Sequence, residues 1–248
     1  METLFSHRSI RKFKAKAVEE DIVNFILEAG MRASNTGNMQ AYSIVCTADE
    51  ALLRELAPCH FNQPASKAPV QLTFCADFNR FSKWCRQRNA EPGYDNFLSF
   101  LVGMTDALLA AQNCCIAAEE KGLGICYLGT TLYKAEAIID ILNLPLGVVP
   151  VITVVMGYPD EEPELVDRLP LYGVVHRERY HDYSEEEIDK IYAEKEALPS
   201  TANFIRENRK DTLAQIFTDN RYPKAVNEDI SKTLLAVLAK QGFMNNGK

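Results

Sequence analysis

The stretch "VVPVITVVM", residues 148–156, decides the fold class. It is almost continuously apolar and rich in β-branched residues, which predicts a central strand buried on both faces. Outward from it, residues 42–47 and 70–76 predict two more short strands, the second entered by Pro69, and residues 125–129 predict a buried strand or turn. Helical patterns separate these strands without strict strand–helix–strand alternation. We therefore expect an α+β protein and not a doubly wound parallel sheet.

The strongest helical pattern covers residues 97–118. Apolar residues recur there at steps of four and three, and such a seam packs along another helix, either in this chain's own core or in a partner subunit. Shorter helices are expected at 18–33, from an Asp49 cap to about residue 57, and at 134–142. The members of the seam are Phe97, Leu101, Met104, Leu108, Ala111, Cys115 and Ala118.

The remaining segments divide the chain into a core and an extension. Residues 78–96 are rich in aromatic and basic side chains and are expected to form an irregular excursion loop, while Val174 and Val175 predict a last short strand. Beyond residue 184 the chain reads as charged helices, at 185–197, about 209–218 and 228–241. We expect a core of residues 1–183 and a helical extension of residues 184–248 that wraps the core or a partner.

Composition excludes several classes. A formal charge of −7 argues against nucleic acid as a partner. No signal peptide is visible, and the best apolar run, residues 144–157, is too short to span a bilayer. Seven cysteines without a Cys-x-x-Cys pair indicate reduced thiols in a cytoplasm, and the four histidines show no zinc spacing. We expect a cytoplasmic protein with no membrane partner and no metal.

Common catalytic motifs are absent, which leaves two polar stretches. There is no Gly-x-Ser-x-Gly, P-loop or Gly-x-Gly-x-x-Gly pattern. "HRSIRKF", residues 7–13, places His7, Arg8 and Arg11 on one face if it forms a helical turn, and guanidinium groups match phosphate geometry. "SNTGNMQ", residues 34–40, offers polar groups after a helix end. Taken alone, the first is more often a solvated basic face and the second more often an ordinary loop.

Six stretches in order resemble one family: "HRSIRKF", "RASNTGNMQ", "APVQLTFCADFNR", "AAEEKGLGICYLG", "LPLGVVPVITVVMGYP" and "RLPLYGVVHRERY". The sequence is similar to the FMN-dependent nitroreductase superfamily, within it the oxygen-insensitive nitroreductase and flavin reductase group of NfsA type. The resemblance covers residues 5 to about 180, and "NRKDT" at 208–212 matches more loosely. It implies a nitroreductase-like fold, a mixed and mostly antiparallel sheet flanked by helices, and a homodimer with flavins at the subunit interface.

The resemblance also implies a role for particular residues toward FMN. The N-terminal motif would hold the phosphate and ribityl chain, with Arg168 as a second phosphate ligand; Val166 stands where the group often has Lys. Residues 35–40 would line the ring and ribityl chain, and Gln63 the pyrimidine edge. The turn at 127–130 would face the reactive nitrogen, with Thr130 replacing a usual glycine. The full set is His7, Arg8, Ser9, Arg11, Asn35, Thr36, Asn38, Gln40, Gln63, Tyr127, Leu128, Gly129, Thr130 and Arg168.

The implied activity is ping-pong two-electron transfer from NADPH or NADH, through FMN, to a nitroaromatic, quinone or flavin. It requires no protein nucleophile, in agreement with the absent motifs. Arg206, Arg209 and Lys210 form either a site for the nicotinamide phosphate or a solvated helix end, and Phe81 or Trp84 is a candidate lid. The alternatives are a different acceptor on the same fold, a flavin-binding protein without turnover, and a scaffold that binds no flavin.

Overall fold

The computed structural model describes residues 2–246 and divides the chain into two compact units. The first unit consists of two segments, one that ends at Glu164 and one that begins at Lys232, and the second unit is Leu165–Ser231. This division differs from the expected boundary after residue 183. The end of the chain belongs to the first unit because Leu238 and Phe243 are buried in its hydrophobic core.

The first unit is built on a four-stranded antiparallel sheet. Its strands are β1 (Tyr42–Thr47), β2 (Val70–Asp77), β3 (Gly124–Leu128) and β4 (Val148–Gly157), in the order β1-β2-β4-β3. The central position of β4 confirms the interpretation of its apolar sequence, and β2 beside it is buried along its whole length. Among the described residues, parallel pairing is limited to an isolated bridge between Ser9 and Ile125.

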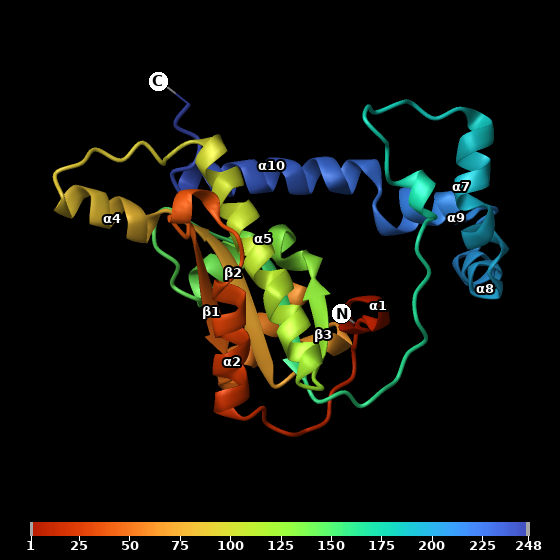
Figure 1. Ribbon diagram of the computed structural model, residues 1–248, viewed down its shortest axis with the longest axis horizontal. Helices are drawn as coiled ribbons and strands as arrows, with labels where there is room; N and C mark the ends of the chain where they lie inside the picture. The colour runs from red at the N-terminus through yellow and green to blue at the C-terminus, as the bar shows by residue number, and fades with distance from the viewer. Residues whose placement is uncertain (1, 247–248) are drawn as a thin grey trace. The chain divides into compact units, whose positions relative to one another are not determined.

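Two helices, α2 (Glu20–Met31) and α5 (Phe97–Glu120), lie together against this sheet (Figure 1). Gly103 allows the close approach of α5, since a Cβ there would lie 2.8 Å from the Ala41 carbonyl oxygen. Gly30 does the same for α2, where a Cβ would lie 2.3 Å from Cys114 Sγ. The helix pair therefore depends on small residues at its contacts.

The side of α5 that faces the core matches the predicted seam in its second half, where Ala111, Cys115 and Ala118 are buried, but not in its first half. Its buried positions are mostly small, including Gly103, Ala107 and Ala110, whereas Phe97 and Leu101 of the seam are exposed. By length and hydropathy α5 is also the one described helix that could cross a membrane, in place of residues 144–157. Its contacts with α2, β2 and β4 mark it as the core helix of this unit.

Shorter elements complete the first unit. α6 (Ala135–Ile141) and the 3-10 helix η4 (Gly129–Lys134) pack against β4, and α1 (Glu2–Ser6) contacts α5. As expected, the Asp49 side chain caps α3 (Glu50–Leu56), accepting a hydrogen bond from the Leu52 N–H. Two further 3-10 helices follow it, η2 (Ala57–His60) and η3 (Pro64–Lys67).

The expectation of an irregular segment at 78–96 is wrong for its first half, where α4 (Asn79–Gln87) forms. The helix buries Cys85, and its Phe81 ring packs on Trp84 and on Tyr94. The contact with Tyr94, in the segment that follows α4, stabilises the helix. The many basic residues of this stretch had indicated an irregular loop. Trp84 itself remains half exposed.

The second unit is helical. It contains η5 (Leu171–Gly173), α7 (Glu185–Ala197), α8 (Pro199–Asn208) and α9 (Leu213–Gln215), which continues as the π-helix η6 (Ile216–Arg221). α10 (Lys224–Lys240) begins here and crosses into the first unit. The prediction of a strand at Val174–Val175 is wrong, since these exposed residues follow η5 in a turn. α8 was not anticipated.

Candidate functional site

Residues 7–13, here called the N-terminal strap, are extended and not a helical turn. The N–H of Ile10 donates to the Ile125 carbonyl at 2.8 Å, and Ser9 bridges to Ile125, so the strap runs beside β3. Gly124 makes this approach possible, because a Cβ there would lie 2.6 Å from Ile10. The expectation that His7, Arg8 and Arg11 share one helical face is therefore wrong. In an extended chain, alternate residues point to opposite sides.

The strap separates its two arginines. Arg8 and Ile10 line a cavity of about 620 Å³ together with Glu119 and Glu161, and the buried Nε of Arg8 has no hydrogen-bond partner. The side chain of Arg11, by contrast, has no ion pair with a described residue. It lies close enough to β3 for its positive charge to lower the pKa of Cys126, which burial raises.

Two glutamates hold the strap in place. Glu161 Oε1 accepts hydrogen bonds from the backbone N–H groups of Arg11 and Lys12, at 2.5 and 3.0 Å. His7 Nδ1 lies 2.6 Å from Glu119 Oε1 on α5. The His7 side chain is thereby bound to α5 through Glu119, while the Arg11 guanidinium remains available to bind an anion.

The turn from β3 into η4 lies at the same edge of the sheet as the strap. Tyr127 lies in β3, its hydroxyl is 3.3 Å from Gln112 Oε1, and burial raises its pKa. Gly129 is exposed, and a Cβ added there would meet no atom within 4 Å. Thr131 secures the turn, since its Oγ1 lies 2.8 Å from the Leu128 carbonyl and 2.9 Å from Thr153 Oγ1 on β4.

His60 connects this turn with Gln63. Its Nδ1 is 2.9 Å from Thr130 Oγ1, and its carbonyl accepts from the Gln63 N–H at 3.2 Å. The His60 ring is fully buried, which lowers its pKa to about 4. The sequence interpretation missed this residue, because a single histidine has no spacing signal. The strap, the 127–130 turn and residues 60–63 thus form one connected region.

The loop of residues 34–40 is held elsewhere, by a buried aspartate on α5. Asp106 accepts hydrogen bonds from the N–H and hydroxyl of Thr36, at 2.9 and 3.1 Å, and from the Ala41 N–H at 3.1 Å. Asn35 Oδ1 accepts from the Gln40 N–H, and Asn38 and Gln40 both adopt positive φ. Asp106 was not singled out in the sequence, since one acidic residue inside an apolar helix pattern carries no motif.

These two regions lie at opposite edges of the sheet. The loop leads into β1 and the strap pairs with β3, so that β2 and β4 separate them. Figure 1 shows β1 and β3 on either side of β2. Three strand spacings amount to about 14 Å. The cavity lined by Met39 and Gln40, of about 420 Å³, is formed with α2 and Arg80 and with no residue of the strap. A single chain therefore does not assemble all the expected site residues around one cavity.

Arg168 belongs to the second unit. Its guanidinium donates to the Val166 and Asp167 carbonyls, at 3.1 and 2.9 Å, and forms no ion pair with a described residue. The Asp167 carboxylate is instead bound by Lys195 at 2.7 Å. The guanidinium of Arg168 is therefore available to an external anion.

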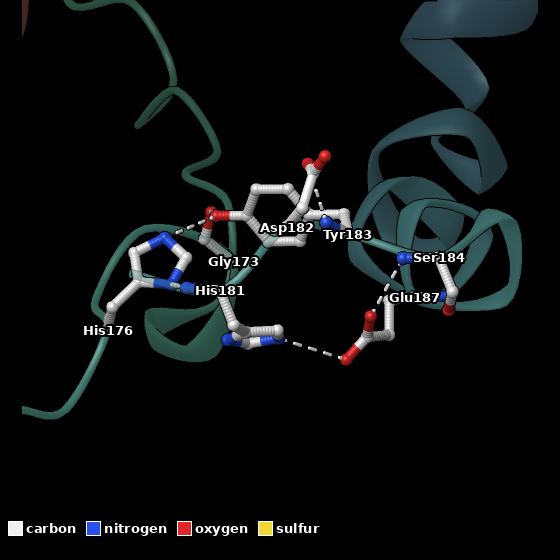
Figure 2. Close-up of polar contacts among 7 residues, drawn as sticks. All are labelled: Gly173, His176, His181, Asp182, Tyr183, Ser184 and Glu187. Carbon is white, nitrogen blue, oxygen red and sulfur yellow. Dashed lines mark hydrogen bonds and ion pairs between the residues drawn. The ribbon is translucent and has the colours of Figure 1, made fainter. Parts of the chain in front are cut away.

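The chain after Arg168 is closed by a clasp of side chains, shown in Figure 2. The Tyr183 hydroxyl donates to the Gly173 carbonyl at 3.1 Å and lies 3.0 Å from His176 Nε2, while the His181 N–H donates to His176 Nδ1 at 3.4 Å. Ser184 and Glu187 form a capping box at the start of α7. The N–H groups of Val174 and Val175 both donate to the Leu171 carbonyl, at 3.2 and 2.9 Å, so this segment continues the turn after η5 and does not extend as a strand.

The proposed nicotinamide-phosphate residues differ in availability. Lys210 forms an ion pair with Asp219 at 2.8 Å, and Arg206 donates to Asn203 at 2.8 Å. Arg209 ends α8 in a left-handed conformation and has no ion pair with a described residue. Of the three, Arg209 is the most available to a phosphate.

The strap and the β3–η4 turn have the properties that a phosphorylated flavin requires. Arg11 supplies an uncompensated guanidinium, the buried Arg8 Nε lacks a partner, and the space around Gly129 lets a planar ring approach the backbone. Polar residues at 34–40 and Gln63 supply hydrogen-bonding groups of the kind that a ribityl chain and a pyrimidine edge use. The residues present fit FMN.

Comparison with known proteins decides the family. The model of the nitroreductase family matches residues 4–158, which include the strap, the whole sheet and the β3–η4 turn. The chain belongs to the nitroreductase family. Its NADPH-flavin oxidoreductase relative from Vibrio harveyi is 34% identical over 189 residues, 76% of this chain and 77% of that protein.

Solved nitroreductase structures confirm the nitroreductase-like fold. A Bacteroides fragilis protein described as an oxidoreductase is 54% identical, with a TM-score of 0.97, covering 98% of this chain and 100% of that one. The NADPH:FMN oxidoreductase of Vibrio harveyi, solved with NAD⁺, is 30% identical with a TM-score of 0.83, over 98% and 97% of the two chains. The NfrA1 nitroreductase of Bacillus subtilis has a TM-score of 0.88 at 27% identity, over 99% of both chains.

Proposed function

We propose that this nitroreductase-family protein is an FMN-dependent NAD(P)H oxidoreductase that reduces small electron-poor acceptors by a ping-pong scheme. The observation that carries the proposal is the strap hydrogen-bonded to β3, which places Arg11, without an ion-pair partner among the described residues, near Cys126 in the strand that leads into the turn at Gly129. Relatives named NADPH-flavin oxidoreductase and FMN reductase (NADPH) support it.

The phosphate would be held by the strap through Arg11 and Ser9, which lie on one side of the extended chain. The roles of Arg8 and Arg168 that the resemblance implies stay predictions. Guanidinium groups without an internal carboxylate partner bind a dianion better than paired ones, because no existing ion pair must be broken. His7 contributes indirectly by tying the strap to Glu119.

The ring would lie against the turn at residues 127–130. FMN supplies the redox chemistry, accepting a hydride from the nicotinamide and passing two electrons to the acceptor. The backbone N–H groups of Gly129 and Thr130 would stabilise negative charge on the reduced ring, and the Tyr127 hydroxyl is kept neutral by its raised pKa. Gln63 would bind the pyrimidine edge.

The site would be completed in a homodimer. The residues of the 34–40 loop lie at the opposite edge of the sheet, so they would serve the second copy's flavin. α5 supports this: Leu98, Leu101 and Leu109 are 70%, 42% and 43% exposed and follow one stripe of the helix. The next position of this stripe is Gln112, which contacts Tyr127. A partner covering the stripe would therefore reach the ring-binding turn.

We further propose that Arg209 binds the additional phosphate of NADPH and so selects NADPH over NADH, with smaller contributions from Arg206 and Lys210. We also propose that Trp84 covers the bound acceptor. The relatives named for NADPH support the first point. The half-exposed Trp84, held by Phe81, supports the second. We place the enzyme in the cytoplasm, acting on small molecules without a nucleic acid or membrane partner, with residues 184–248 serving as a helical extension.

Steady-state kinetics test the proposal. Initial rates measured at several concentrations of NADPH and a nitroaromatic should give parallel double-reciprocal lines, as a ping-pong scheme requires. The same protein assayed with a quinone and with free FMN identifies the preferred acceptor class. Intersecting lines, or FMN binding without turnover of any acceptor by NADPH or NADH, would contradict the proposal.

A further inference from the structure

His60 is a buried titratable residue that the assignment of the flavin-binding residues does not use. Its side chain is fully enclosed, yet Nε2 has no hydrogen-bond partner among the described residues. Leaving such a group unpaired costs about 1–3 kcal/mol. A smaller apolar residue would avoid this cost, so the imidazole must contribute through its other nitrogen.

That other nitrogen, Nδ1, contacts Thr130, which is one of the residues expected at the ring. The distance from Nδ1 to Thr130 Oγ1 is 2.9 Å. Thr130 is only partly buried, and it follows the exposed Gly129. The hydroxyl of Thr130 therefore connects a buried imidazole to the surface of the ring-binding turn.

The segment after His60 is strained in a way that holds the imidazole in position. Phe61 and Asn62 both adopt positive φ, at 55° and 50°. For a phenylalanine this conformation is unfavourable and persists only where the surroundings enforce it. Here the Phe61 and Asn62 N–H groups donate to the carbonyls of Pro58 and Ala57, both at 3.0 Å. The backbone thereby fixes His60 between Thr130 and Gln63.

The protonation of His60 follows from its burial. With its pKa lowered to about 4, the ring is neutral near pH 7 and carries one proton. A proton on Nε2 would leave an unsatisfied buried N–H, which is rarer in proteins than an unsatisfied acceptor. The proton therefore belongs on Nδ1, where it is donated to Thr130 Oγ1.

We propose that His60 is a positioning residue for the bound flavin, which donates from Nδ1 to Thr130 Oγ1 and so leaves the Thr130 hydroxyl proton for an acceptor on the ring. This inference rests on the proposed FMN site. A hydroxyl that accepts one hydrogen bond is a stronger donor in the next, because successive bonds polarise one another. Thr130, which replaces a usual glycine of the family, thus adds a donor that a glycine lacks.

The consequence is a preference for the reduced flavin, which carries more negative charge at the ring than the oxidised form. Thr130→Val keeps the shape and removes the donor. We expect it to weaken binding of reduced FMN relative to oxidised FMN about tenfold, which lowers the two-electron potential by about 30 mV. His60→Leu should lower it by a smaller amount, because the Thr130 hydroxyl remains but is no longer polarised and oriented by Nδ1. The double variant should lower it no further than Thr130→Val alone, because without the hydroxyl His60 has no group to position.

Conservative variants separate positioning from general packing. Thr130→Ser keeps the hydroxyl, and His60→Asn places an amide N–H near the position of Nδ1, so both should keep a potential close to that of the wild type. The readouts are the potential of bound FMN, measured by equilibration with a reference dye, and the ¹⁵N spectrum of the His60 ring in protein without FMN. The spectrum should show a protonated Nδ1.

The outcomes separate a failure of the proposed FMN-dependent function from a failure of the proposed role of His60. If the wild type binds no FMN, the proposed function fails. If it binds FMN but Thr130→Val has the wild-type potential, or the ring spectrum shows a protonated Nε2, the role of His60 is overturned. Should His60→Leu not fold, the Thr130 variants and the ring spectrum of the wild type still decide the question.

Discussion

The carboxylate of Asp106, buried in the middle of α5, lies 2.9 Å from the backbone N–H of Thr36. With the Thr36 hydroxyl and the Ala41 N–H it accepts three hydrogen bonds. One buried acidic side chain thus determines the conformation of the loop that we assign to the flavin of the second subunit. The core helix and the candidate site are in this way coupled.

Asp106→Ala should destabilise the fold and release this loop. Three donors would lose their acceptor, and we expect the free energy of unfolding to fall by about 3 kcal/mol, measured by urea denaturation. FMN affinity should fall as well. Glu55→Gln, an exposed acidic residue on α3, is the control and should change neither quantity. An Asp106→Ala protein with wild-type stability would show that these bonds have no net effect.

Arg11→Ala should weaken FMN binding by about 10- to 100-fold with little change in stability, because the guanidinium is exposed and without an internal partner. The measurement is a titration of FMN fluorescence. The matched control is Lys12→Ala, the adjacent exposed cation on the other side of the extended strap. Equal effects of the two substitutions would indicate a general electrostatic attraction and contradict a specific phosphate site.

The dimer proposal predicts that Leu101→Glu, or Leu109→Glu, yields a monomer with reduced FMN occupancy. A charge on the exposed stripe of α5 cannot be buried without a large desolvation cost. Sedimentation velocity and the flavin-to-protein absorbance ratio measure the two effects. Leu146→Glu, at a residue 69% exposed in the loop before β4, is the control. A wild type that sediments as a monomer would refute the interface.

Stability should decrease in mild acid because of His60. Its folded-state pKa of about 4 lies below the unfolded value of 6.5, so between these values the unfolded chain binds the extra proton. The contribution is fully present above pH 6.5 and is lost as the pH falls toward 4, by up to about 3 kcal/mol. Urea melts of wild type and His60→Asn across this range should differ in slope, with the variant flatter. Parallel profiles would contradict the lowered pKa.

Tyr183→Phe should loosen the clasp in the second unit. It removes the donor to the Gly173 carbonyl and the contact with His176. We expect faster amide hydrogen exchange at residues 173–183 and a loss of about 1 kcal/mol. The control is Tyr180→Phe, since the exposed Tyr180 contacts His176 through its ring, which the substitution keeps. If both variants exchange alike, the hydroxyl has no role.

Local signals explain which elements the sequence predicted. β1 and α7 have the ranges expected from the sequence, residues 42–47 and 185–197. The start of α7 is fixed by neighbouring residues alone, since Ser184 and Glu187 form its capping box. α4 was missed because its stability comes from Phe81 and Tyr94, which are distant in sequence. The strap was misjudged for the same reason: spacing of three and four indicated a helical turn, but pairing with β3 keeps the strap extended. Pairing across the fold is not visible in a local pattern.

The candidate site shows the same limit. The motifs identified the strap, the 34–40 loop and the 127–130 turn, but not that the first two lie at opposite edges of the sheet. His60 and Asp106 gave no signal, because a buried polar residue acquires its role only from partners that folding brings to it. The spacing of residues in the motifs therefore indicated which chemical groups form the site. Only the tertiary structure showed where these groups lie relative to one another.

The most direct test of the central claim is the visible absorption spectrum of the purified protein, loaded with FMN and recorded without air before and after addition of NADPH. The account predicts a protein-bound flavin spectrum that bleaches on addition and returns when a nitroaromatic is added. A bound flavin that neither NADPH nor NADH bleaches would contradict the assigned activity. A protein that takes up no FMN would contradict the assignment of the strap itself.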